Sequence, residues 1–217
     1  MDQLELKIKY NIYALDLPSH NNSEDFQDLS LDLYTDVLKS FLDYLKVNKV
    51  ILAGHSLGGA VIQDYYFKYP NDVTALILIG TGGRLRVDPS IFNTLKTDYQ
   101  EYLKSLPAGA FYSKTPRKVI NGCIDETSKT PPEVISCDFQ ICDEFDTLNK
   151  THTITIPCLI LCGNFDKLTP IKYSQFFHDK LEKSEFKIIN NAGHMVMLEK
   201  PKHVNRAIKN FINSLKK

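Results

Sequence analysis

The chain has 217 residues, of which 43% are hydrophobic and 24% charged, and its 26 basic residues balance 26 acidic ones. This composition is typical of a globular protein with one sizeable core, and the length does not require two independent domains. The zero net charge, without long runs of either sign, gives no attraction for nucleic acid or an anionic membrane. We therefore expect a small or neutral ligand as the partner.

The N-terminal residues are polar and charged, without the apolar core of a signal peptide. No apolar stretch approaches the roughly 20 residues that would span a bilayer. We therefore expect a soluble, cytoplasmic protein with no membrane partner. The five cysteines form an odd set without the paired spacing of a metal site, and a buried small hydrophobe is the simplest role for Cys158 and Cys162.

Short apolar runs alternate with longer amphipathic stretches, which indicates an α/β fold with a mostly parallel sheet and helices on both faces. Each predicted strand is short, β-branched or leucine-rich, and ends near Gly, Pro or Asn. Continuous apolar runs of this kind suit strands that are covered on both faces. The predicted strands are 11–15, 49–53, 75–79, 158–161 and 186–189.

Helical patterns lie between these runs. Apolar residues recur at a spacing of four from Leu29 to Leu45, which predicts one buried stripe on a helix. A second helix is predicted over 60–69, where Pro70 ends it, and a third over 171–181, after Pro170. The last amphipathic helix carries Val204, Ile208, Phe211, Ile212 and Leu215.

The stretch from 84 to 155 interrupts the alternation, because it holds half of the ten prolines and short helical patches without a clear strand. A long insertion after a strand end is usually functional. We interpret residues 84–155 as a small, mostly helical lid over the strand ends. Residues 1–83 and 156–217 then form the core.

The strongest motif is G-x-S-x-G, which runs from Gly54 to Gly58 around Ser56. It directly follows an apolar strand and opens the second predicted helix, so Ser56 lies at a tight strand-to-helix turn. The backbone of such a nucleophile is strained, and side chains two residues to either side would clash. The helix N-terminus also favours developing negative charge. The motif predicts that Ser56 is a nucleophile.

A serine hydroxyl needs a positioned base, and His194 has the best setting among the six histidines. It lies in a loop just past the last predicted strand. For His55, the neighbour of the serine, we expect packing or pocket lining as its role. Asp166 follows the fourth predicted strand, where it can fix the tautomer of the base. The order Ser56, Asp166, His194 is the order expected of a serine hydrolase with this architecture.

Four stretches together resemble the lid-bearing α/β-hydrolases of esterase and lipase-like type. They are 16–23, similar to a D-x-P-G-H-G-x-S loop; 54–59, the nucleophile elbow; 161–170, the acid loop G-x-x-D-x-x-x-P; and 191–201, the histidine loop. The resemblance implies the α/β-hydrolase fold and a Ser56–His194–Asp166 triad. It further implies that the backbone N–H of Leu57 binds the oxyanion, and that no cofactor or metal is needed.

Two departures from the family pattern matter. Ser19 and Asn21 replace glycines in the first loop, and serine tolerates left-handed backbone less well than asparagine, so we expect a reshaped loop. The family's opening strands have no counterpart in this sequence. The loop that supplies the second oxyanion donor belongs to those strands, so this donor has no candidate here either. We therefore expect an N-terminally short member with reduced competence, whose bare sheet edge favours self-association.

Three functions fit these residues. The first is hydrolysis of a carboxylic ester or related acyl compound through an acyl-enzyme. The second keeps the triad but acts on other bonds, as a C–C bond hydrolase, thioesterase or aminopeptidase. The third is a truncated, weakly active or inactive family member that only binds ligand. A serine rather than an aspartate at position 56 argues against the dehalogenases and epoxide hydrolases of this fold.

Overall fold

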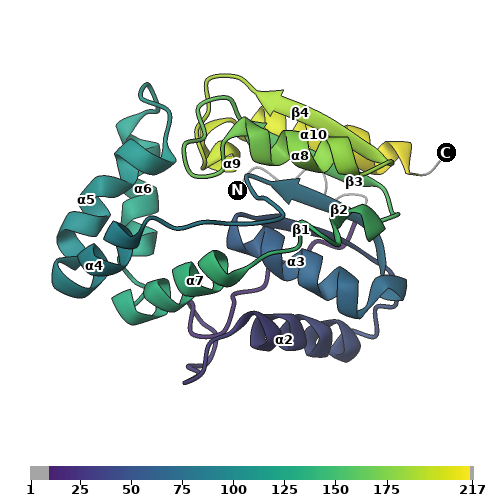
Figure 1. Cartoon of the computed structure of the whole chain (residues 1–217), viewed down its shortest axis with the longest axis horizontal. Helices are drawn as coiled ribbons and strands as arrows, with labels where there is room; N and C mark the ends of the chain where they lie inside the picture. Colours follow the sequence, from purple (N-terminus) through teal and green to yellow (C-terminus); the bar gives the residue numbers. More distant parts are fainter. Residues whose placement is uncertain (1–9, 216–217) are drawn as a thin grey trace.

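The structure is a computed structural model that describes residues 10–215. Figure 1 shows its elements in chain order. They are α2 (Leu31–Tyr44), β1 (Val50–His55), α3 (Leu57–Lys68), η1 (Pro70–Asp72), β2 (Val73–Ile79), α4 (Pro89–Thr97), α5 (Tyr99–Ala110), α6 (Arg117–Thr127), α7 (Pro132–Glu144), η2 (Thr151–Thr153), β3 (Cys158–Gly163), α8 (Ile171–Lys180), β4 (Ser184–Ile189), α9 (Val196–Glu199) and α10 (Pro201–Ser214).

Within the described residues, four parallel strands form one sheet in the order β1-β2-β3-β4. Each connection between neighbours crosses over through helices, as parallel pairing requires. The α/β fold and four of the five predicted strands are therefore confirmed. The carboxyl ends of the strands point toward the side of the molecule where α4, α5 and α6 are grouped (Figure 1).

Side chains of the central strands alternate between two cores, one on each face of the sheet. Ile77 and Leu159 point into a core that α10 covers with Val204 and Phe211. The neighbouring positions of β2 and β3 point the other way, into a core covered by α2, α3 and α8. Cys158 and Cys162 are fully buried. The continuous apolar runs in the sequence thus mark strands covered on both sides.

The predicted strand 11–15 is wrong. Residues 11–17 form no strand; Asn11, Tyr13 and Ala14 are exposed, and the others are half-buried. Ile12 packs against the core beneath α10, and the Tyr13 ring meets Phe41 edge-on at 5.8 Å between centroids. The composition of the segment fits a strand, but strand pairing needs an aligned neighbour, which composition does not reveal.

The first loop keeps its left-handed backbone despite the two missing glycines. Ser19 has a φ of 64° and Asn21 a φ of 47°. The Ser19 hydroxyl accepts a hydrogen bond from the backbone N–H of Phe26 at 2.9 Å, and the Asn21 amide donates to Asp16 at 3.0 Å. These local bonds offset the strain at both positions.

We call α4–α7, residues 89–144, the helical segment. It contains helices where short helical patches were expected, and α7 leads back to the sheet. The chain enters and leaves the helical segment close together, because Arg84 and Asp146 form an isolated antiparallel β-bridge. Their two side chains also form an ion pair. Between residues 10 and 215, no helix has the length and apolar character needed to cross a membrane.

Candidate active site

The backbone of Ser56 has a conformation that only a constrained turn imposes. Its φ of 52° and ψ of −117° lie outside the regions that most residues adopt, and α3 begins at the next residue. The Ser56 N–H donates to the carbonyl of Ile79 at 3.0 Å, and the Thr81 hydroxyl donates to the Ser56 carbonyl at 2.9 Å. Ile79 is the last residue of β2 and Thr81 follows this strand, so the strand next to β1 fixes the turn. This strained geometry matches the predicted nucleophile elbow.

Two glycines permit this turn, and they are not quite the expected pair. A side chain at Gly54 would place its Cβ 2.1 Å from the carbonyl oxygen of Gly58, and one at Gly59 would lie 2.4 Å from Thr81. A Cβ at Gly58 itself would meet nothing within 4 Å. The expectation that positions 54 and 58 both exclude side chains is therefore correct for Gly54 only. The second position that excludes a side chain is Gly59, because the start of α3 packs closely against Thr81, just after β2.

Asp166 and His194 are in direct contact. The Nδ1 atom of His194 lies 2.9 Å from Oδ2 of Asp166, and both residues are buried. Because a carboxylate oxygen only accepts, Nδ1 carries the proton and Nε2 is left free to act as a base. This is the arrangement in which an acid orients a general base.

The loop after β3 holds the Asp166 carboxylate with three further donors. The backbone N–H groups of Leu168 and Thr169 donate to Oδ1 at 3.0 and 2.8 Å. The Thr169 hydroxyl donates to Oδ2 at 2.8 Å and lies 3.3 Å from Nδ1 of His194. Burial alone raises the pKa of Asp166, but the bonds from His194 and Thr169 outweigh it and hold the pKa below its ordinary value. Asp166 thus stays ionised beside His194.

His55 holds the backbone of His194. Its Nε2 lies 2.9 Å from the carbonyl oxygen of His194, and the two imidazole rings are 4.5 Å apart between centroids. Since a carbonyl only accepts, Nε2 of His55 is the protonated nitrogen. Burial, together with the nearby His194, lowers the pKa of His55 to about 3, so this imidazole is neutral at ordinary pH. Sequence reasoning expected packing or pocket lining, and it did not anticipate this contact.

The carboxyl ends of all four strands contribute to this constellation. Ser56 follows β1, Asp166 follows β3 and His194 follows β4, while a Cβ at Gly80, after β2, would lie 3.3 Å from both Asp166 and His55. Among the described residues, no hydrogen bond joins the Ser56 hydroxyl to His194. Catalytic hydrogen bonds are often long without substrate and tighten when it binds. Leu57 opens α3, so its N–H has no partner within the helix.

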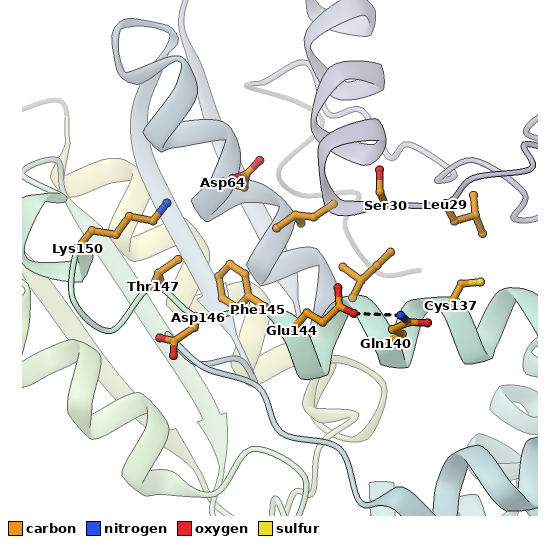
Figure 2. A pocket seen from close by; sticks show the side chains of 12 residues that line it. Leu29, Ser30, Asp64, Cys137, Gln140, Glu144, Phe145, Asp146, Thr147 and Lys150 are labelled. Carbon is orange, nitrogen blue, oxygen red and sulfur yellow. Dashed lines mark hydrogen bonds between the residues drawn. The ribbon is translucent and has the colours of Figure 1, made fainter.

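A separate cavity of about 380 Å³ lies between α2, α3 and α7, and it contains none of these residues (Figure 2). Its charged groups already have partners. Glu144 accepts from Gln140 at 3.0 Å, Asp64 pairs with Lys68 at 2.9 Å, and the Lys150 ammonium lies 4.2 Å from the ring centroid of Phe67. We therefore do not place the reaction in this cavity.

The chain is similar in sequence and structure to known hydrolases. The alpha/beta hydrolase family matches residues 2–207 of the chain. The solved structure of a thermophilic esterase is 37% identical, with a TM-score of 0.85, over 92% of this chain and 79% of that one. Monoacylglycerol lipase ABHD6 of Bos taurus is 23% identical over 94% of this chain and 68% of its own length. YugF, an uncharacterized hydrolase of Bacillus subtilis, is 26% identical over 95% of this chain and 82% of its own.

Proposed function

Because this chain belongs to the alpha/beta hydrolase family, we propose that it hydrolyses carboxylic esters through a Ser56–His194–Asp166 triad. One observation carries the proposal: the 2.9 Å bond from His194 to Asp166 lies at the strand ends where Ser56 occupies its strained turn. The similarity to a thermophilic esterase at 37% identity supports an ester as the substrate class.

In the first half of the reaction, the Ser56 hydroxyl attacks the ester carbonyl while Nε2 of His194 takes its proton. The carbonyl oxygen becomes an oxyanion, which the free N–H of Leu57 stabilises at the start of α3. Asp166 stabilises the imidazolium that forms. His194 then returns the proton to the departing alcohol, which leaves an acyl group on Ser56.

In the second half, His194 removes a proton from water, and the hydroxide attacks the acyl carbonyl. The bond to Ser56 breaks, His194 gives the proton back to the serine oxygen, and the carboxylic acid leaves. All proton transfers use one nitrogen, because Nδ1 is committed to Asp166. We further propose that the helical segment, which lies at the same end of the strands, acts as the lid that selects the acyl or alcohol group.

A fluorophosphonate probe tests the nucleophile directly, since it forms a covalent bond only with an activated serine. We expect labelling of the wild type and of Ser128→Ala, an exposed serine at the end of α6, but not of Ser56→Ala. Hydrolysis of p-nitrophenyl esters is expected to fall by at least about 10³-fold in Ser56→Ala. A Ser56→Ala protein that retains ester turnover would refute the proposal. Thioesters and amides in the same panel measure how far the activity extends beyond esters.

A further inference from the structure

The carboxyl end of α5 is completed by the two loops that carry the proposed acid and base. The carbonyl of Ala110, the last residue of α5, accepts from the backbone N–H groups of His194 and Met195 at 2.8 and 3.1 Å. The carbonyl of Ala108 accepts from the Lys167 ammonium at 2.9 Å. The last carbonyls of a helix have no partner within it. Here the loops after β3 and β4 supply the missing donors.

Glu199 makes a second connection between the histidine loop and the helical segment. One oxygen of its carboxylate, Oε1, accepts from the backbone N–H of Gly193 at 2.7 Å. The other, Oε2, accepts from the backbone N–H of Tyr112 at 2.9 Å and from the hydroxyl of Thr115. The first donor immediately precedes His194, and the other two belong to the helical segment just after α5. One carboxylate therefore connects the histidine loop to residues 112–115 by hydrogen bonds.

The two backbones joined by Glu199 are in close contact, without room for a side chain between them. A Cβ at Gly193 would lie 2.7 Å from the carbonyl carbon of Phe111 and 2.8 Å from the nitrogen of Tyr112. Phe111 is buried, and the Tyr112 ring packs on Phe165 in the acid loop at 4.5 Å between centroids. Movement of residues 111–112 therefore displaces Gly193, and with it His194.

We propose that Glu199 is a positioning residue for the base, which fixes His194 by holding its loop against residues 112–115. This role rests on the proposed function of His194. The chemistry requires a carboxylate, because all three partners are donors placed at both oxygens. A glutamine amide offers one acceptor oxygen, and its NH₂ group would face a donor at the other end. Glutamine therefore breaks the connection on one side while keeping the size of the side chain.

The test compares Glu199→Gln with Glu182→Gln, an exposed carboxylate between α8 and β4. We expect Glu199→Gln to lower kcat for a p-nitrophenyl ester by about 10- to 100-fold with KM within about 2-fold, because a misplacement of about 1 Å costs up to 10²-fold. The control keeps the wild-type kcat. The downfield proton resonance of the His194 Nδ1–H in its bond to Asp166 should shift or broaden in Glu199→Gln only.

A Glu199→Gln protein with the wild-type resonance and kcat would overturn the proposal. If the wild type itself hydrolyses no ester, the proposed function fails, and the resonance still decides the role of Glu199. If Glu199→Gln does not fold, Thr115→Val decides, since it removes one donor to Oε2 and leaves the carboxylate in place. A smaller shift of the same resonance then supports the proposal, and an unchanged resonance contradicts it.

Discussion

The two halves of the candidate site are built in different ways. The proposed acid–base half, Asp166 and His194, is held by side-chain bonds from Thr169 and His55 and by the main chain of Ala110. The nucleophile half, Ser56, is held by backbone geometry between β1 and α3. The first half depends on side-chain hydrogen bonds, and the second on close backbone packing at Gly54 and Gly59 and on the bonds to Ile79 and Thr81. We therefore expect chemical changes to damage the first half and steric changes to damage the second.

The largest effect is expected from Asp166→Asn, which changes the hydrogen bonding of the acid–base half but keeps the shape of the side chain. The amide nitrogen would face Nδ1 of His194, so the imidazole would adopt the wrong tautomer and lose its basic Nε2. We expect kcat to fall by about 10⁴-fold, while the melting temperature changes little. Asp125→Asn, on the exposed face of α6, serves as the control. Activity within tenfold of the wild type would show that Asp166 is not the acid.

The next largest effect is expected from Gly54→Ala, which creates a steric clash with the backbone of the nucleophile half. The new Cβ would lie 2.1 Å from the Gly58 carbonyl oxygen, and backbone atoms cannot move aside cheaply. We expect a loss of about 3 kcal/mol of unfolding free energy, or about 6–12 °C in melting temperature. Gly58→Ala is the matched control, because its Cβ meets nothing within 4 Å. Equal destabilisation of the two variants would contradict the steric account.

A smaller effect is expected from the titration of His55. The unfolded chain takes up a proton there near pH 6.5, whereas the folded protein does not until the pKa of about 3. The stability that His55 contributes is thus present above pH 6.5 and is lost as the pH falls, by up to about 1.4 kcal/mol per pH unit. Urea unfolding between pH 6.5 and 5 measures this slope.

His55→Gln should flatten that slope, because it removes the titrating group and keeps a side-chain amide that can donate to the His194 carbonyl. His20 acts in the opposite sense, mainly near the upper end of this range. Its hydrogen bond to Asp138 raises its pKa, so the stability it contributes is present below pH 6.5 and is lost as the pH rises above it. An unchanged slope in His55→Gln would show that His55 is not held neutral.

The smallest effect is expected from Thr169→Val. The change removes one hydroxyl bond to Oδ2 of Asp166 and keeps the backbone N–H that binds Oδ1. A single hydrogen bond of about 1 kcal/mol corresponds to a decrease of about 5- to 10-fold in kcat. Thr169→Ser keeps the hydroxyl and should remain near the wild type. A loss as large as that of Asp166→Asn would place Thr169 in the reaction itself.

Much of the site could be predicted from local sequence. Ser56, Asp166 and His194 each stand in a short motif after an apolar run, and parallel strands bring such positions to one edge. The structure places all three there and joins Asp166 to His194. The roles themselves remain predictions for the experiments above.

The supporting contacts could not be predicted in the same way. The bonds from His55 to the His194 carbonyl and from the His194 N–H to the Ala110 carbonyl depend on how distant segments dock, and backbone atoms carry no sequence signal. Thr169 and Glu199 lie inside the acid-loop and histidine-loop stretches, and their presence there is the only signal that could have drawn attention to them. The wrong strand at 11–15 has the same origin, since pairing is a property of two segments.

The orientation of α5, whose carboxyl end faces the His194 backbone, has an electrostatic consequence for the proposed reaction. The carboxyl end of a helix carries partial negative charge and its amino end partial positive charge. Here the amino end of α3 adjoins Ser56, where the proposed mechanism forms an oxyanion, and the carboxyl end of α5 adjoins the main chain of His194, where the proposed mechanism forms an imidazolium. The two macrodipoles therefore favour the charge separation of the transition state from opposite sides. A substitution that unwinds the last turn of α5 is therefore expected to slow the reaction.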